Sequence, residues 1–170
     1  MRSVAVFVAA LLASESLYDQ ALRLYSQQRY EQAEPILRQA VVKHPRSVPV
    51  RFLLGSTLLK LKRDDEALRE LKMGNQLNPA RADVAKLLAS EYLRARQPAV
   101  AIEVVLALLR TTPPDEETFV LLSTAYETRA KPGDAEVARR LIEQGLKRYP
   151  RSARLRAASR RLQASAEAKD

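Results

Sequence analysis

Residues 48–81 read VPVRFLLGSTLLKLKRDDEALRELKMGNQLNPAR and divide into two amphipathic halves on either side of a charged turn. In the first half Leu54 and Leu58 recur at the spacing of one helix face, and in the second half Ala67 and Leu71 do the same. A proline stops the second half, because it lacks an N–H group and biases the residue before it away from helix. The stretch therefore predicts two helices joined by a short turn.

This pattern recurs along the chain with a period of 34 residues. Four classes of residue keep the period: closing prolines, small residues in each first helix, large residues one helical turn later, and alanines in each second helix. Their members are Pro45, Pro79 and Pro113; Ala21, Gly55, Ala89 and Ser123; Leu24, Leu58, Tyr92 and Tyr126; and Ala33, Ala67 and Ala101. Agreement among four independent classes indicates a repeat protein.

Each period is expected to form one helix pair, which gives repeat units at about 14–47, 48–81, 82–115 and 116–150. The last unit has a longer turn, so its alanine and proline come three residues late. Pro98 is expected in the first turn of a helix, where its missing N–H group costs nothing. Asp134 is expected to be the N-cap residue of the helix that follows the longer turn.

The C-terminal stretch, residues 151–170, predicts a basic capping helix. Leu155, Ala158 and Leu162 form its one apolar stripe, and the other side is rich in arginine. Of the net charge of +9, residues 1–138 carry +2 and residues 139–170 carry +7. Electrostatic arguments about partners therefore apply to the C-terminal end.

The pattern resembles the tetratricopeptide repeat, with Leu-Gly and then Tyr on the first helix and Ala, a large apolar residue and Pro on the second. The second unit carries Leu54-Gly55, Leu58, Ala67, Leu71, Gly74 and Pro79, and the fourth carries Phe119, Leu122-Ser123, Tyr126, Ala138, Ile142, Gly145 and Pro150. The resemblance spans about residues 14–150. It implies an all-α, right-handed α-solenoid of about four helix pairs, closed by the capping helix. It also implies that the first helices line a concave face where partner peptides bind.

On that face, helical spacing places residues from the first helix of every unit. They are Tyr18, Leu22 and Tyr25; Phe52, Ser56, Leu59 and Lys60; Lys86, Ser90, Leu93 and Arg94; and Val120 and Thr124. Small side chains in the middle leave room for a chain, and the apolar or basic flanks suit an apolar segment with a carboxylate nearby. The alternative for residues such as Tyr18, Phe52 and Leu59 is that they only pack against neighbouring repeats.

We therefore expect a non-catalytic scaffold that binds a peptide or helix of another protein. The alternative is an adaptor that docks on nucleic acid or an anionic surface through its arginine-rich last helix. Few aromatic residues lie among those arginines, which argues against nucleic acid. The sequence leaves the partner, the cellular process and the oligomeric state open.

Residue types that carry catalysis or bind metals are scarce. The chain has no cysteine and one histidine, His44, which lies before a proline at an expected helix end. The acidic runs 64–66 and 115–117 could suggest metal ligands, but each lies at an expected helix start, where carboxylates are favourable. No glycine-rich phosphate loop is evident. We expect no enzymatic activity, no metal and no cofactor.

Residues 1–13 contain one arginine followed by about ten apolar residues, the outline of a secretory signal peptide. The run is too short for a transmembrane helix, which needs about 20 apolar residues. If the segment is a signal peptide, export to the periplasm is expected. If it is instead an apolar extension of the first helix, a cytoplasmic location is expected.

Overall fold

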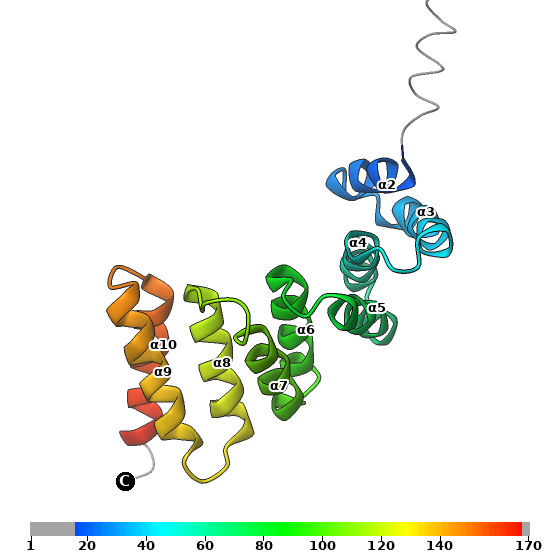
Figure 1. Ribbon diagram of the computed structural model, residues 1–170. Coiled ribbons are helices and arrows are strands. Elements are labelled where there is room, and N and C mark those ends of the chain that lie inside the picture. Colours follow the sequence, from blue (N-terminus) through cyan, green and yellow to red (C-terminus); the bar gives the residue numbers. More distant parts are fainter. Residues whose placement is uncertain (1–15, 168–170) are drawn as a thin grey trace, which may run out of the picture. The chain divides into compact units, whose positions relative to one another are not determined.

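The structure is a computed structural model that describes residues 16–167. The described chain is helical and contains no strand, which confirms the all-α fold class. Its helices are α2 (Leu17–Ser26), α3 (Tyr30–Lys43), α4 (Val48–Lys60), α5 (Asp64–Leu77), α6 (Ala82–Arg94), α7 (Pro98–Leu108), α8 (Glu116–Arg129), α9 (Asp134–Arg148) and α10 (Ala153–Glu167) (Figure 1). The segment at residues 1–13, with its two alternative interpretations, lies outside the described residues. None of the described helices is long and apolar enough to span a bilayer.

The helices pack as consecutive pairs within two compact units. The first unit ends at Leu77 and holds the pairs α2–α3 and α4–α5; the second begins at Asn78 and holds α6–α7, α8–α9 and the single helix α10. Inside each unit the second helix of a pair also contacts the first helix of the next pair, as α3 contacts α4, α7 contacts α8 and α9 contacts α10. This connectivity confirms the helix pairs predicted from the 34-residue period.

Small residues occupy the positions where paired helices cross. The periodic alanines are fully buried, with 0% of their surface exposed: Ala21, Ala33, Ala67, Ala89 and Ala101. The tightest crossing is at Gly55 on α4, where an added Cβ atom would lie 2.8 Å from Cγ and 2.9 Å from Cδ2 of Leu71 on α5. A side chain larger than hydrogen at this position would therefore displace Leu71.

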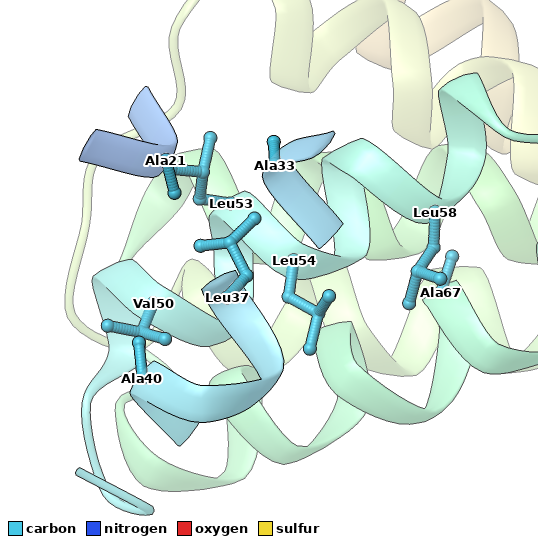
Figure 2. Close-up of a cluster of buried hydrophobic side chains, with 9 residues drawn as sticks. All are labelled: Ala21, Ala33, Leu37, Ala40, Val50, Leu53, Leu54, Leu58 and Ala67. Carbon is cyan, nitrogen blue, oxygen red and sulfur yellow. The ribbon is translucent and has the colours of Figure 1, made fainter. Parts of the chain in front are cut away.

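The core of the first unit combines side chains from both of its helix pairs. Figure 2 shows a cluster of nine buried apolar residues, which come from α2, α3, α4 and α5. Leu37, Leu54 and Leu58 are the most completely buried leucines of this cluster, and each is 1% exposed or less. Full burial of one such side chain contributes about 1.5–3 kcal/mol relative to exposure. Because neither pair supplies this core alone, the two pairs stabilise each other.

The second unit ends in the helix that the sequence predicts as a cap. Leu155, Ala158 and Leu162 of α10 are 0%, 2% and 6% exposed, and they cluster with Phe119 of α8 and Ile142 of α9. The exposed positions of α10 carry arginine, other polar residues and alanine, and no large apolar side chain. The expected capping helix is thus confirmed.

The turn inside each of the first three pairs contains one residue with left-handed backbone geometry, and the longer turn of the fourth pair contains two. Gln28, Lys62 and Arg96 have φ angles of 60°, 62° and 58°, and they follow the 34-residue period. In the longer turn Ala130 has a φ of 52° and is the C-cap residue of α8. A residue with a side chain costs about 1–2 kcal/mol in this conformation, whereas glycine adopts it readily.

One predicted helix start is confirmed and one is wrong. Helix α7 begins at Pro98, as expected. The N-cap residue of α9 is Gly133, with a φ of 85°, and Asp134 is instead the first helical residue. The Asp134 carboxylate turns back to accept hydrogen bonds from the Lys131 backbone N–H at 2.9 Å and from Arg129 Nη2 at 2.6 Å. It therefore holds the turn between α8 and α9 closed.

We expect Ala130→Gly to stabilise the protein by about 0.5–1 kcal/mol. The variant removes the left-handed strain of an alanine, and the greater freedom of glycine in the unfolded chain offsets part of the gain. Ala157→Gly, on an exposed position of α10, is the matched control and should destabilise by about 1 kcal/mol. Thermal and urea unfolding followed by circular dichroism measures both. Equal losses in the two variants would contradict the assignment of strain to Ala130.

Candidate functional site: the first-helix faces

The predicted site residues of the first unit lie on α2 and α4, which contact each other. We call them the first-helix face of unit 1: Tyr18, Leu22 and Tyr25 on α2, and Phe52, Ser56, Leu59 and Lys60 on α4. They flank the small crossing residue of each helix, so they share a side of the helix by register. The structure thus brings these seven residues onto two adjacent helices.

This face is apolar and only partly covered. Leu22 is 41% exposed, and Tyr18, Phe52 and Leu59 are half-buried. Tyr18 and Leu59 also pack against the core of the unit, so the packing alternative holds for part of their surface. Ser56 is 9% exposed.

The tyrosine at the end of α2 is held in place by a second ring. The Tyr25 ring meets the Tyr30 ring edge-on, with 5.2 Å between ring centres. Burial, and then the neighbouring Tyr30, raise the pKa of Tyr25, so its hydroxyl stays protonated and uncharged. Lys60, exposed in the last turn of α4, is the one charged residue among the seven.

The predicted site residues of the second unit lie on α6 and α8, which also contact each other. We call these the first-helix face of unit 2: Lys86, Ser90, Leu93 and Arg94 on α6, and Val120 and Thr124 on α8. Leu93 and Val120 pack partly against the two apolar clusters of the unit. Ser90 and Thr124 are half-buried.

The cations of this second face are already paired. Lys86 Nζ lies 2.8 Å from Asp115 Oδ2 and 2.7 Å from Glu117 Oε2, and Arg94 pairs with Glu91. A carboxylate ligand would have to compete with these ion pairs. A partner carboxylate at Lys86 or Arg94 would have to displace Asp115, Glu117 or Glu91 from these cations.

The sequence did not indicate that α10 would add to this face. Arg161 of α10 bonds to Glu127 of α8 through Nε and through Nη2, the latter at 2.8 Å, and its Nη2 lies 3.3 Å from the Thr124 hydroxyl. The signal was present in the spacing, because Arg161 follows Thr124 by the same 37 residues that separate Pro150 from Pro113. The capping helix thus continues the row of first helices in unit 2.

Asp115, the first residue of the acidic run 115–117, has two roles, and the sequence predicted one of them. Asp115 is the N-cap residue of α8, with Oδ1 accepting from the Thr118 N–H at 2.9 Å, which confirms the helix-start interpretation. Its second role, the ion pair with Lys86, links α6 to α8. Among the described residues no cluster of three or more metal-ligating side chains occurs.

An arginine also lies where the repeat pattern has a large apolar residue. Arg51 of α4 is 8% exposed, and its Nε donates to the Pro45 carbonyl at 2.8 Å. Its Nη1 lies 2.6 Å from Glu70 Oε2 on α5. Burial is tolerated because the guanidinium has both a carbonyl and a carboxylate partner.

Three carboxylates have a pKa well below the ordinary value. Hydrogen bonds from Arg63 and Arg38 lower the Glu66 pKa from 4.5 to about 2, and the Arg129 hydrogen bond lowers the Asp134 pKa from 3.8 to about 2. Partial burial alone would raise the pKa of Asp115, but hydrogen bonds from Lys86 and Thr118 outweigh it and lower the value to about 2. Each carboxylate therefore favours the folded state when ionised.

We expect stability to be highest above about pH 5 and to fall steadily toward pH 2, because protonation removes these three contributions. Asp115→Asn/Asp134→Asn should lower the melting temperature at neutral pH and flatten its fall between about pH 4 and pH 2. Glu103→Gln, which neutralises an exposed carboxylate on α7, is the control. Circular dichroism melts across this range measure the slopes, and an unchanged slope in the double variant would contradict the assignment.

Comparison with known proteins identifies the repeat. Residues 24–91 match the sequence model of a family described as tetratricopeptide repeat. This range contains the whole second unit, the first unit from Leu24 onward and the beginning of the third unit. No curated protein matches the chain in a sequence search.

Several solved structures share the fold at low sequence identity. A MamA protein from Desulfovibrio magneticus RS-1, residues 41 to the end, is 16% identical with a TM-score of 0.78, covering 89% of this chain and 84% of that one. TTC0263, a thermophilic tetratricopeptide repeat protein of Thermus thermophilus, is 18% identical with a TM-score of 0.66, covering 87% and 80%. A tetratricopeptide repeat protein of Parabacteroides merdae ATCC 43184 is 14% identical with a TM-score of 0.75, covering 86% and 56%. Residues 24–91 are thus tetratricopeptide repeat in sequence, and the 34-residue period and the consecutive helix pairs continue the same repeat fold through the described chain.

Proposed function

We propose that the protein is a non-catalytic scaffold that binds a segment of a partner protein on its first-helix faces. The family supports the general role, because tetratricopeptide repeats serve as protein-binding modules. The partly exposed apolar residues of the first-helix face of unit 1 support this location for the binding site. The partner segment is an extended peptide or a helix whose apolar side chains contact the first-helix face of unit 1.

The observation that carries the proposal is the incomplete burial of the apolar residues of that face. Leu22 keeps 41% of its surface exposed beside the half-buried rings of Tyr18 and Tyr25. Covering an apolar side chain contributes about 25 cal/mol per Å² removed from water. A partner segment that covers these residues would therefore gain affinity without disturbing the core beneath them.

The first-helix face of unit 2 has a complementary role in this proposal. Its cations are already paired with carboxylates of the same unit, and its central side chains, Ser90 and Thr124, are small and polar. Such a surface contributes hydrogen bonds and selectivity more than affinity. Because the main contribution comes from apolar contact, binding should depend only mildly on ionic strength.

Site-specific photocrosslinking in the native host tests this proposal. A photoreactive phenylalanine in place of Phe52 should crosslink to one or a few proteins, and Leu22→Glu should reduce that crosslink by about tenfold, since it places a charge in the apolar contact. The control position is Val42 on α3, which is 81% exposed and lies outside the first-helix face.

The proposal fails if position 52 gives no crosslinked protein, or gives the same proteins as position 42. Circular dichroism of Leu22→Glu establishes that the fold is retained. That variant replaces a side chain already 41% exposed, so a general loss of structure is not expected.

A further inference from the structure

The end of the second unit carries a concentrated positive charge that the rest of the described chain does not have. Residues 144–166 contain no aspartate or glutamate and seven cations: Lys147, Arg148, Arg151, Arg154, Arg156, Arg160 and Arg161. All seven are exposed. We call them the C-terminal basic surface; they lie on the last turn of α9, the following turn and α10.

Elsewhere in the described chain, cations are commonly balanced by carboxylates. Ion pairs hold Arg38, Arg51, Arg63, Arg81, Lys86, Arg94, Arg129, Arg139 and Arg140. On the C-terminal basic surface only Arg161 has a carboxylate partner among the described residues. The other six cations repel one another, so a bound anionic group would relieve that repulsion.

The arginines of α10 form two rows. Arg156 and Arg160 are four residues apart and share one side of the helix, while Arg154 and Arg161 are seven apart and share another. Exposed alanines, Ala153 and Ala157, lie between the rows. Guanidinium groups at this spacing match carboxylates that recur every three or four residues on a helix.

Within the protein itself, Arg161 of α10 already binds a carboxylate of a neighbouring helix. It holds the Glu127 carboxylate with Nε at 3.1 Å and Nη2 at 2.8 Å from the same oxygen, and Nε also lies 3.2 Å from the second oxygen. A guanidinium on an exposed side of α10 thus binds a carboxylate presented by a neighbouring helix. The arginines of the other row have the same side chain and no such partner among the described residues.

Two other anionic partners fit the surface less well. The apolar residues of α10, Leu155, Ala158 and Leu162, are buried in the core, so the helix has none left to insert into a bilayer. The aromatic residue nearest the surface, Tyr149, lies under the Arg148 guanidinium, and α10 contains no aromatic residue for stacking with bases.

We propose that the C-terminal basic surface binds an acidic helical segment of a partner protein, with Arg156 and Arg160 contacting its carboxylates. This interaction is separate from the apolar contact on the first-helix face of unit 1. Each surface can be tested without the other.

The test uses the full chain and a fluorescent helical peptide with glutamate at every third or fourth position, read by fluorescence anisotropy. Arg156→Gln/Arg160→Gln should weaken binding by about tenfold or more, since two charge-assisted contacts are lost. Arg139→Gln/Arg140→Gln is the matched control, because it removes two exposed arginines from α9 that already pair with Glu136. The control should change affinity by less than about twofold.

Three results would overturn the proposal: no binding of the glutamate peptide at low ionic strength, equal weakening in both double variants, or equal binding of a peptide with glutamine in place of glutamate. Tighter binding of duplex DNA or of vesicles containing phosphatidylserine would also overturn it in favour of a phosphate ligand. Leu22→Glu should leave the affinity for the glutamate peptide unchanged, because Leu22 lies outside the C-terminal basic surface. The two proposals can therefore fail separately.

Discussion

The fold depends on close approach between the two helices of each pair. At the tightest crossing, a single added carbon on Gly55 would lie 2.8 Å from Leu71, well inside van der Waals contact. The small residues at the equivalent positions of the other pairs, Ala21, Ala89 and Ser123, are fully buried. Because the backbones approach this closely, large side chains such as Leu54 and Leu58 can point along the stack and meet the neighbouring pair. The same few small residues thus set both the pairing of helices and the stacking of pairs.

Charge is distributed in two ways along this framework. Ion pairs connect successive helix pairs within the body of each unit, as Arg38 with Glu66 and Lys86 with Asp115 do. The first-helix face of unit 1 is almost uncharged, and the C-terminal basic surface has one carboxylate partner for seven cations among the described residues. An apolar face and an unbalanced basic surface would suit different parts of a partner protein.

The sequence predicted most of the fold because the repeat encodes it several times. Proline, small-residue and alanine positions each specify the same helix pair, so a departure in one unit does not hide the period. An aspartate after Pro-Gly is a typical N-cap candidate by residue type, and for that reason the sequence predicted Asp134. In the structure the Asp134 side chain instead accepts a hydrogen bond from Arg129 across the turn, so the N-cap prediction was wrong. The left-handed Gln28, Lys62 and Arg96 could not be predicted from composition, because none is glycine.

The candidate site was predictable in outline and not in its electrostatics. Helical register alone places Tyr18, Leu22 and Phe52 on the first helices, and those helices contact each other. The pairing of Lys86 with Asp115 and Glu117 joins residues about 30 positions apart, and it depends on side-chain conformations that register alone does not specify. Arg161 was missed for a related reason, since the last helix was expected only to close the solenoid.

A double-mutant cycle at the Gly55 crossing tests the central claim most directly. Gly55→Ala alone should destabilise the protein by about 1–3 kcal/mol, because Leu71 must move. In a Leu71→Ala background, the same change should be neutral or stabilising by up to about 1 kcal/mol, because alanine favours helix over glycine once the clash is gone. Urea unfolding of the four proteins gives the coupling energy. A cost for Gly55→Ala that is the same in both backgrounds would contradict the account.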